Sequence, residues 1–65
     1  MMQFTYDKDA DAAYIKFEQS TVKRTLSLDD NVHLDFDDSK RLVGVEILQA
    51  SKLLSRKALL DAQRA

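Results

Sequence analysis

The sequence contains no cysteine, one histidine and one glycine among its 65 residues. The absence of cysteine excludes disulfides, thiolate metal sites and a cysteine nucleophile. A single histidine excludes a zinc site built from several histidines of one chain. A chain this short forms one domain, residues 1–65, which buries only about 60% of its unfolded surface. Small domains are usually reinforced by disulfides, metal or oligomerisation, so we predict a homodimer.

Long apolar runs and a marked excess of either charge are also missing. The apolar runs are too short to span a membrane, and the first residues lack the charged and apolar regions of a signal peptide. Ten basic residues face eleven acidic ones, for a net charge of -1, without the basic surplus of a dedicated nucleic-acid binder. We therefore expect a cytoplasmic prokaryotic protein that binds neither membrane nor nucleic acid.

Residues 2–48 alternate between apolar and polar side chains with a period of two, which is typical of half-buried β-strands. In the clearest strand, Val32, Leu34 and Phe36 lie on one face, and His33 and Asp35 lie on the other. Turns rich in aspartate separate the strands. The pattern predicts an α+β fold, an antiparallel β-meander of four to five short strands packed with a C-terminal α-helix.

The last fifth of the chain changes character. Residues 50–63 contain Ala, Leu, Lys, Arg and Gln, which are good helix formers, and no glycine or proline, which predicts a helix. On one continuous helix, Leu59 lies nearly opposite the apolar arc. Either the helix breaks at Ser55, which then caps a second helix, or Leu59 faces a partner subunit. Gly44 lies inside the last strand, where a glycine often marks a bulge or a close approach of the backbone.

Two groups of carboxylates have the spacing of a calcium-binding loop. Both lack the glycine that the sixth position requires, since Ala12 and Lys40 stand there, and both continue into strand-like alternation. We therefore interpret them as turn carboxylates and keep Asp7, Asp9 and Asp11 as metal candidates. The residues at the first, third, fifth and twelfth positions are Asp7, Asp9, Asp11 and Glu18 in one copy, and Asp35, Asp37, Ser39 and Glu46 in the other.

The polar face of the clearest strand carries residue types that are used in catalysis and metal binding. His33 and Asp35 share one strand face, and such a pair is able to bind a metal or act as a general base. There is no partner histidine and no serine in a nucleophile motif, so we interpret them as a surface strand face. No catalytic residue and no cofactor is predicted, and we do not expect an enzyme. Tyr14, on a polar strand face, is an interface candidate together with Leu59.

The basic residues give no pattern of their own. Lys52, Arg56 and Lys57 suit a solvent-facing helix surface, because no aromatic side chain is interleaved for base stacking. Arg24 differs from them, since it lies on the apolar face of its strand. A charge at that position must extend to water, pair with a carboxylate or block edge-to-edge association.

Three blocks of sequence resemble a small bacterial family, the uncharacterised "domain of unknown function 2283", or YuzE-like, family. They run from Tyr6 to Ile15, from Leu28 to Asp37, and from Leu42 to Leu48 followed by Ala50-Ser51-Lys52. The resemblance implies a compact meander with a C-terminal helix, and it implies no activity, because the family has no established one. The tail from residue 53 lies outside the blocks. Matching positions that merit inspection are Asp7, Asp11, Tyr14, Asp30, Gly44, Glu46 and Ser51.

The leading functional hypothesis is a non-enzymatic interaction or binding module that forms a homodimer. The first alternative is an antitoxin-like regulatory partner of a neighbouring small protein, to which the chain presents a strand edge or its helix. The second alternative is a metal-binding protein that uses the Asp-rich turn.

Overall fold

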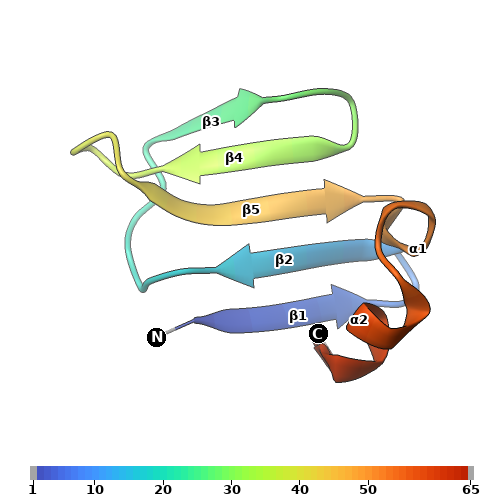
Figure 1. The fold of residues 1–65 in the computed structure, drawn as a ribbon. Coiled ribbons are helices and arrows are strands. Elements are labelled where there is room, and N and C mark those ends of the chain that lie inside the picture. Colours follow the sequence, from blue (N-terminus) through green and yellow to red (C-terminus); the bar gives the residue numbers. More distant parts are fainter. Residues whose placement is uncertain (1, 65) are drawn as a thin grey trace.

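The computed structural model describes residues 2–64, which form one sheet and two short helices near the C-terminus (Figure 1). This architecture confirms the α+β fold class and the antiparallel strands predicted from the sequence. No helix in the described part is long and apolar enough to cross a membrane. The elements are β1 (Gln3–Asp7), β2 (Ala12–Lys16), β3 (Arg24–Ser27), β4 (Val32–Phe36), β5 (Leu42–Leu48), α1 (Ala50–Leu53), α2 (Arg56–Asp61) and β6 (Gln63–Arg64).

The strand order places β5 near the middle of the sheet. The order is β3-β4-β5-β2-β1-β6, with antiparallel neighbours except for the parallel pair of β1 and β6. A hairpin of β1 and β2 is joined by residues 17–23 to a three-stranded meander of β3, β4 and β5. Because β5 also pairs with β2, this seven-residue strand holds the hairpin and the meander together.

Three of the turns use the same device, which explains the abundance of aspartate. Each begins with an aspartate whose carboxylate oxygen accepts two backbone N–H groups from the following residues, at 2.7 to 3.3 Å. Such side-chain-to-backbone bonds favour a turn over continued strand. The aspartates are Asp7, Asp29 and Asp37.

The C-terminal helical region breaks at Ser55, as in the first of the two alternatives. Ser55 has an extended backbone, and its hydroxyl accepts a hydrogen bond from the Ala58 amide at 3.1 Å, so it caps α2. The helical region ends at Asp61. Gln63 and Arg64 then form β6 beside β1, instead of extending the helix to residue 63.

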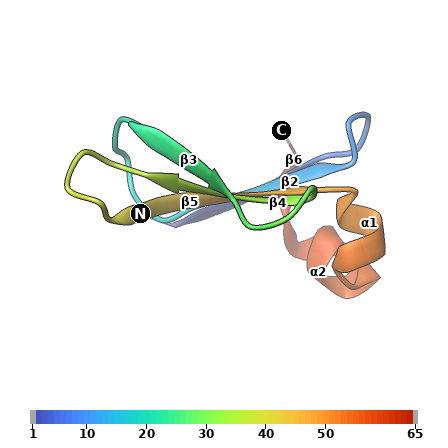
Figure 2. The same cartoon turned by 90° about the horizontal axis from the view of Figure 1, so that it is seen from above.

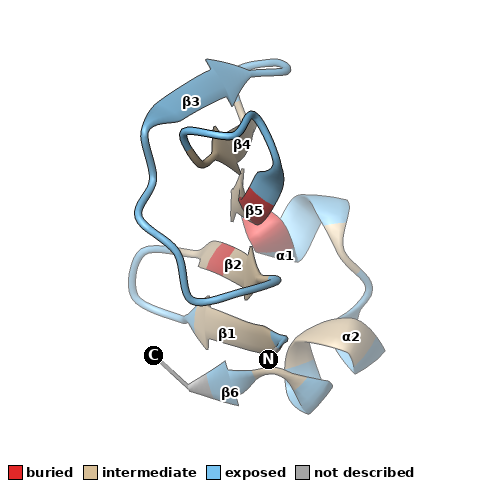
Figure 3. Cartoon of the chain, turned by 90° about the vertical axis from the view of Figure 1, so that its left-hand side faces the viewer, coloured by how far each residue is buried: buried red, intermediate tan, exposed pale blue. Residues whose placement is uncertain are grey.

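The core is thin. Among residues 2–63, the fully buried apolar side chains are Ala13, Val43 and Ala50, and Val43 is the largest of them (Figure 3). The two helices lie on one side of the sheet and only at one end of it (Figure 2). Since a sheet ordinarily buries its apolar face against a second layer, most of this sheet lacks the layer that would complete a core.

Candidate functional site

The Asp-rich turn holds the first helix in place through Asp11. Its Oδ1 accepts hydrogen bonds from the Tyr6 hydroxyl at 2.6 Å and the Ser51 amide at 2.9 Å, and its Oδ2 accepts one from the Ser51 hydroxyl at 2.8 Å. The Ala50 amide donates to the Asp11 carbonyl at 2.9 Å. Gln49, the residue before α1, makes no side-chain cap. Asp11 therefore satisfies helix N-terminal amides that a local cap usually satisfies.

These hydrogen bonds shift the ionisation of both partners. The bonds from Tyr6 and then from Ser51 lower the pKa of the Asp11 carboxyl below its ordinary value, and the charge of Lys52 acts in the same direction. The bond to Asp11 raises the pKa of the Tyr6 hydroxyl, because only the protonated hydroxyl can donate it; burial and the negative charge of Asp11 act in the same direction. Asp11 is thus an ionised carboxylate whose two oxygens are engaged by donors of the same chain.

The metal candidates of the Asp-rich turn are not brought together as a ligand set. Asp7 accepts turn amides, Asp11 binds Tyr6 and Ser51, and Asp9 lies exposed in the turn. Within residues 2–64, no group of three or more aspartate, glutamate or histidine residues is arranged to hold a metal ion. Metal binding by this turn stays a prediction.

A second network lies on the polar side of the sheet, over Gly44. The Asp35 carboxylate accepts the Thr25 hydroxyl at 2.6 Å and the Tyr14 hydroxyl at 2.7 Å, so it links β3, β4 and β2. Between β4 and β2 the Tyr14 ring lies against Gly44, where a Cβ atom would overlap the Tyr14 hydroxyl. The close approach expected at Gly44 is therefore confirmed. The pairing of β4 with β5 also shifts register between Asp35 and Phe36, beside the glycine.

Tyr14 is a neutral donor in this network. Burial, followed by the hydrogen bond to Asp35, raises the pKa of Tyr14 to about 12, and the negative charges of Asp35 and Glu46 add to the effect. The sequence placed Tyr14 on the polar face correctly, but it did not reveal Asp35 as the partner. Tyr14 and Asp35 are 21 positions apart in the sequence. They come within hydrogen-bonding distance across β5, which lies between their strands in the sheet.

His33 makes a separate contact on the same side of the sheet. Its Nδ1 lies 2.8 Å from the Ser27 Oγ of β3, and Glu46 stands opposite His33 on β5. The distance suits a nucleophile and its base, but hydrolysis also requires oxyanion donors and a place for substrate. Ser27 is exposed on a strand at the edge of the sheet. We interpret the pair as a cross-strand contact, which the sequence analysis missed.

A small cavity lies beside the turn between β4 and β5. Its volume is about 120 Å³, and Arg24, Phe36, Asp37 and Lys40 line it. Sites for drug-sized ligands have volumes of roughly 300 to 1,000 Å³, so this cavity is too small for an organic cofactor. Arg24 stands opposite Phe36 in register, at the rim of the apolar side, and its side chain is exposed. The unusual Arg24 thus extends to water, the first of the three expected outcomes.

The apolar side of the sheet is left mostly uncovered. One row of residues in cross-strand register runs from β1 to β3. The helices lie beside the sheet only at one end of it (Figure 2). None of these side chains is fully buried, and Leu26 is 45% exposed. The other members of the row are half-buried, and a row of apolar side chains that is only partly covered is a candidate interaction surface. We call it the open apolar face, and it consists of Phe4, Ile15, Val45, Leu34 and Leu26 of the row, together with Phe36.

The two interface candidates from the sequence lie away from this face. Tyr14 is half-buried in the network with Asp35, on the opposite side of the sheet. Leu59 is half-buried in α2, which begins after the break at Ser55, whereas the neighbouring Leu60 is 74% exposed. The roles of Tyr14 and Leu59 at an interface stay predictions.

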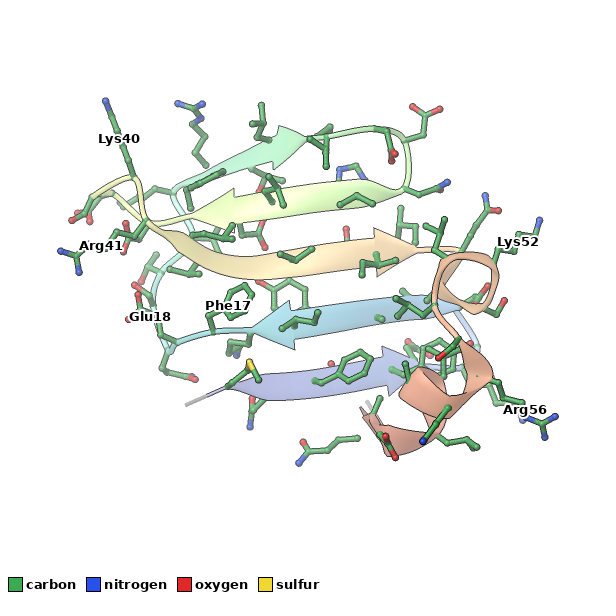
Figure 4. All side chains as sticks on the ribbon, in the orientation of Figure 1. Phe17, Glu18, Lys40, Arg41, Lys52 and Arg56 are labelled. Atoms are coloured by element: carbon green, nitrogen blue, oxygen red, sulfur yellow. The ribbon has the colours of Figure 1, made fainter. Side chains whose placement is uncertain are left out.

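The labelled basic side chains do not gather into one patch. Lys40 and Arg41 lie at one end of the molecule, and Lys52 and Arg56 lie at the opposite end (Figure 4). Four cations separated in this way do not form the continuous basic surface along which a nucleic-acid backbone binds.

These features define a class of small α+β domain with a single sheet. In this class the conspicuous polar residues of the sequence bind one another: Asp11 caps α1, and Tyr14 lies over Gly44. The chain belongs to the family of proteins of unknown function DUF2283, whose family model matches residues 3–51. The resemblance seen in the three blocks is thus confirmed. The matched region contains all members of both networks and ends at Ser51, the residue that Asp11 binds.

The chain is also similar to an uncharacterized protein of the archaeon Methanocaldococcus jannaschii. The two are 41% identical over 54 residues, which cover 83% of this chain and 46% of that relative. The chain therefore spans less than half of the relative's length. Because this relative is archaeal, the bacterial origin expected from the resemblance stays a prediction. No solved structure matches the chain significantly.

Proposed function

We propose that this protein is a non-enzymatic binding module whose working surface is the open apolar face. One observation carries the proposal: a row of large apolar side chains crosses five strands and has no covering layer over most of its length. The prominent polar residues do not compete for that role. Asp11, Tyr14 and Asp35 are engaged with partners of the same chain and stabilise the scaffold.

A charged residue placed on a binding face destabilises the monomer much less than a charged residue placed in a core. Leu26 is 45% exposed, so Leu26→Lys in the monomeric state should lower the free energy of unfolding by less than about 1 kcal/mol, as surface substitutions do. Ser27→Lys is the matched control, because Ser27 is the next residue of β3 and points to the polar side. Urea unfolding followed by circular dichroism measures both, at protein concentrations too low for association.

The same pair of variants tests whether the face is available to a ligand. An apolar fluorescent dye should bind the dilute native chain and Ser27→Lys, and bind Leu26→Lys more weakly. The proposal fails if Leu26→Lys costs roughly 2 to 5 kcal/mol, as core truncations do, while the dye does not bind the native chain. Leu26 would then belong to a core that excludes ligands.

The metal-binding alternative has its own test in the melting temperature. A ligand that binds only the folded state must raise this temperature. Millimolar calcium, magnesium or zinc that leaves the melting temperature of the native chain unchanged removes the alternative. An antitoxin-like role would require a partner protein on the same face or on a strand edge, which places it among the possible uses of the binding module.

A further inference from the structure

We infer that a second copy of this chain covers the open apolar face, so that two sheets pack face to face in a twofold dimer. This inference rests on the proposed function, because it names the occupant of the same surface. A closed twofold pair uses one patch on each copy and leaves no further patch to recruit a third chain. The uncovered row Phe4–Ile15–Val45–Leu34–Leu26 is such a patch.

The area of the chain supports an interface of ordinary size. Its accessible surface is 4973 Å², whereas a compact monomer of 7.4 kDa exposes about 4200 Å². The excess is close to the roughly 800 Å² that each partner contributes to a standard protein interface. One interface with a second copy would therefore bring the surface of each chain to that of a compact protein.

The shape of the open face suits a second sheet. The molecule measures 34 × 26 × 17 Å along its principal axes. Its helices lie beside the sheet only at one end (Figure 2). Packed sheets lie about 10 Å apart, and a helix with its side chains is about 10 to 12 Å thick. The helices of one copy and the sheet of the other can therefore occupy the same layer side by side, without holding the two sheets apart.

The chemistry of the face favours an identical partner over an oppositely charged one. The row that crosses the face contains no charged residue, and Arg24 stands at the rim, exposed to water beside the small cavity. A twofold axis places the same surface patch of the two copies against each other. This arrangement is unfavourable for like charges but suits apolar side chains, and it resembles an apolar interface centre with a polar rim.

The test is the mass of the full native chain and of two variants in solution. Light scattering after size exclusion, from micromolar to millimolar concentration, should give a dimer for the native chain and for Ser27→Lys. Leu26→Lys should be a folded monomer under the same conditions, with its dissociation constant raised at least about a hundredfold, because charge on the face must then be desolvated. Circular dichroism verifies that each variant is folded.

A second readout covers the case in which Leu26→Lys does not fold. The melting temperature of the native chain should rise with protein concentration, since association stabilises the folded state by mass action. A native monomer at millimolar concentration, with a melting temperature independent of concentration, overturns the dimer. The dye-binding face would then be left for a different partner. A dimer whose dissociation constant is equal in Leu26→Lys and Ser27→Lys overturns the placement of the interface on the open apolar face.

Discussion

Gly44 offers the sharpest test of the scaffold, because a single methyl group should distinguish close packing from an ordinary strand position. Gly44 has no positive φ, so its backbone accepts alanine. The obstacle is the Tyr14 ring, whose hydroxyl lies where the new Cβ would stand. We therefore predict that Gly44→Ala destabilises the fold, although alanine in a strand usually helps.

The size of this destabilisation follows from two opposing effects, the steric conflict with Tyr14 in the folded state and the restriction of the unfolded chain. Inserting a methyl group into a packed site costs about 1 to 3 kcal/mol. If the Tyr14 ring swings away instead, it gives up its 2.7 Å hydrogen bond to the Asp35 carboxylate, and a hydrogen bond to a charged acceptor is worth about 1.5 to 3 kcal/mol. Replacing glycine by alanine restricts the unfolded chain and returns about 0.4 to 1 kcal/mol. The net loss is about 1 to 2 kcal/mol, and each kcal/mol lowers the melting temperature of so small a domain by about 4 to 8 °C.

The control is the same substitution without the ring. In a Tyr14→Ala background, Gly44→Ala should be neutral or stabilising by about 0.5 kcal/mol, because only the effect on the unfolded chain remains. Urea unfolding of the four proteins at one fixed concentration completes the double-mutant cycle. Equal effects of Gly44→Ala with and without the ring would refute the account of how Tyr14 and Gly44 pack.

Three further predictions concern the capping and ionisation of the scaffold. Asp11→Asn should speed hydrogen exchange at the start of α1. In the native chain the pKa of Asp11 is lowered, so the stabilisation that this carboxylate provides should be complete above pH 3.8 and disappear as the pH falls through the lowered pKa. Ultraviolet titration should show that Tyr14 has a pKa of about 12. The contribution of Tyr14 to stability should be lost as the pH rises from 10.0 towards 12, and Asp35→Asn should lower the pKa of Tyr14. Ser55→Ala should cost about 1 kcal/mol in urea unfolding and fray α2, whereas Ser55→Asp should retain most of the stability, because aspartate also caps the Ala58 amide.

The strands were accessible from the sequence, and the helix break at Ser55 was one of two alternatives that it left open, because both features depend on local patterns. The alternation of Val32, Leu34 and Phe36 with His33 and Asp35 is what a strand with one buried face requires. The capping of α2 by Ser55 follows from the preference of a helix start for a hydroxyl. Both are decided within a few residues, so no knowledge of the strand order was needed.

The networks were not accessible because they depend on which strands become neighbours. The period of two places Tyr14 on the polar side, but it does not state that β5 lies between β2 and β4. The spacing of the Asp-rich turn predicts only a turn carboxylate at Asp11, whereas its role as the cap of α1 joins residues 40 positions apart. The extension of the helix to residue 63 was expected from composition. In the structure, backbone pairing with β1 takes residues 63 and 64 instead.

The measurement that tests the central claim most directly is the solvent exposure of the methyl groups on the open apolar face as a function of concentration. A soluble paramagnetic probe relaxes exposed methyl groups in nuclear magnetic resonance spectra. The methyl groups of Leu26, Leu34 and Val45 should be relaxed strongly in dilute protein and shielded at millimolar concentration, while that of Thr25, on the opposite side of the sheet, should not change. Methyl groups of the open apolar face that stay equally exposed at both concentrations would contradict the claim.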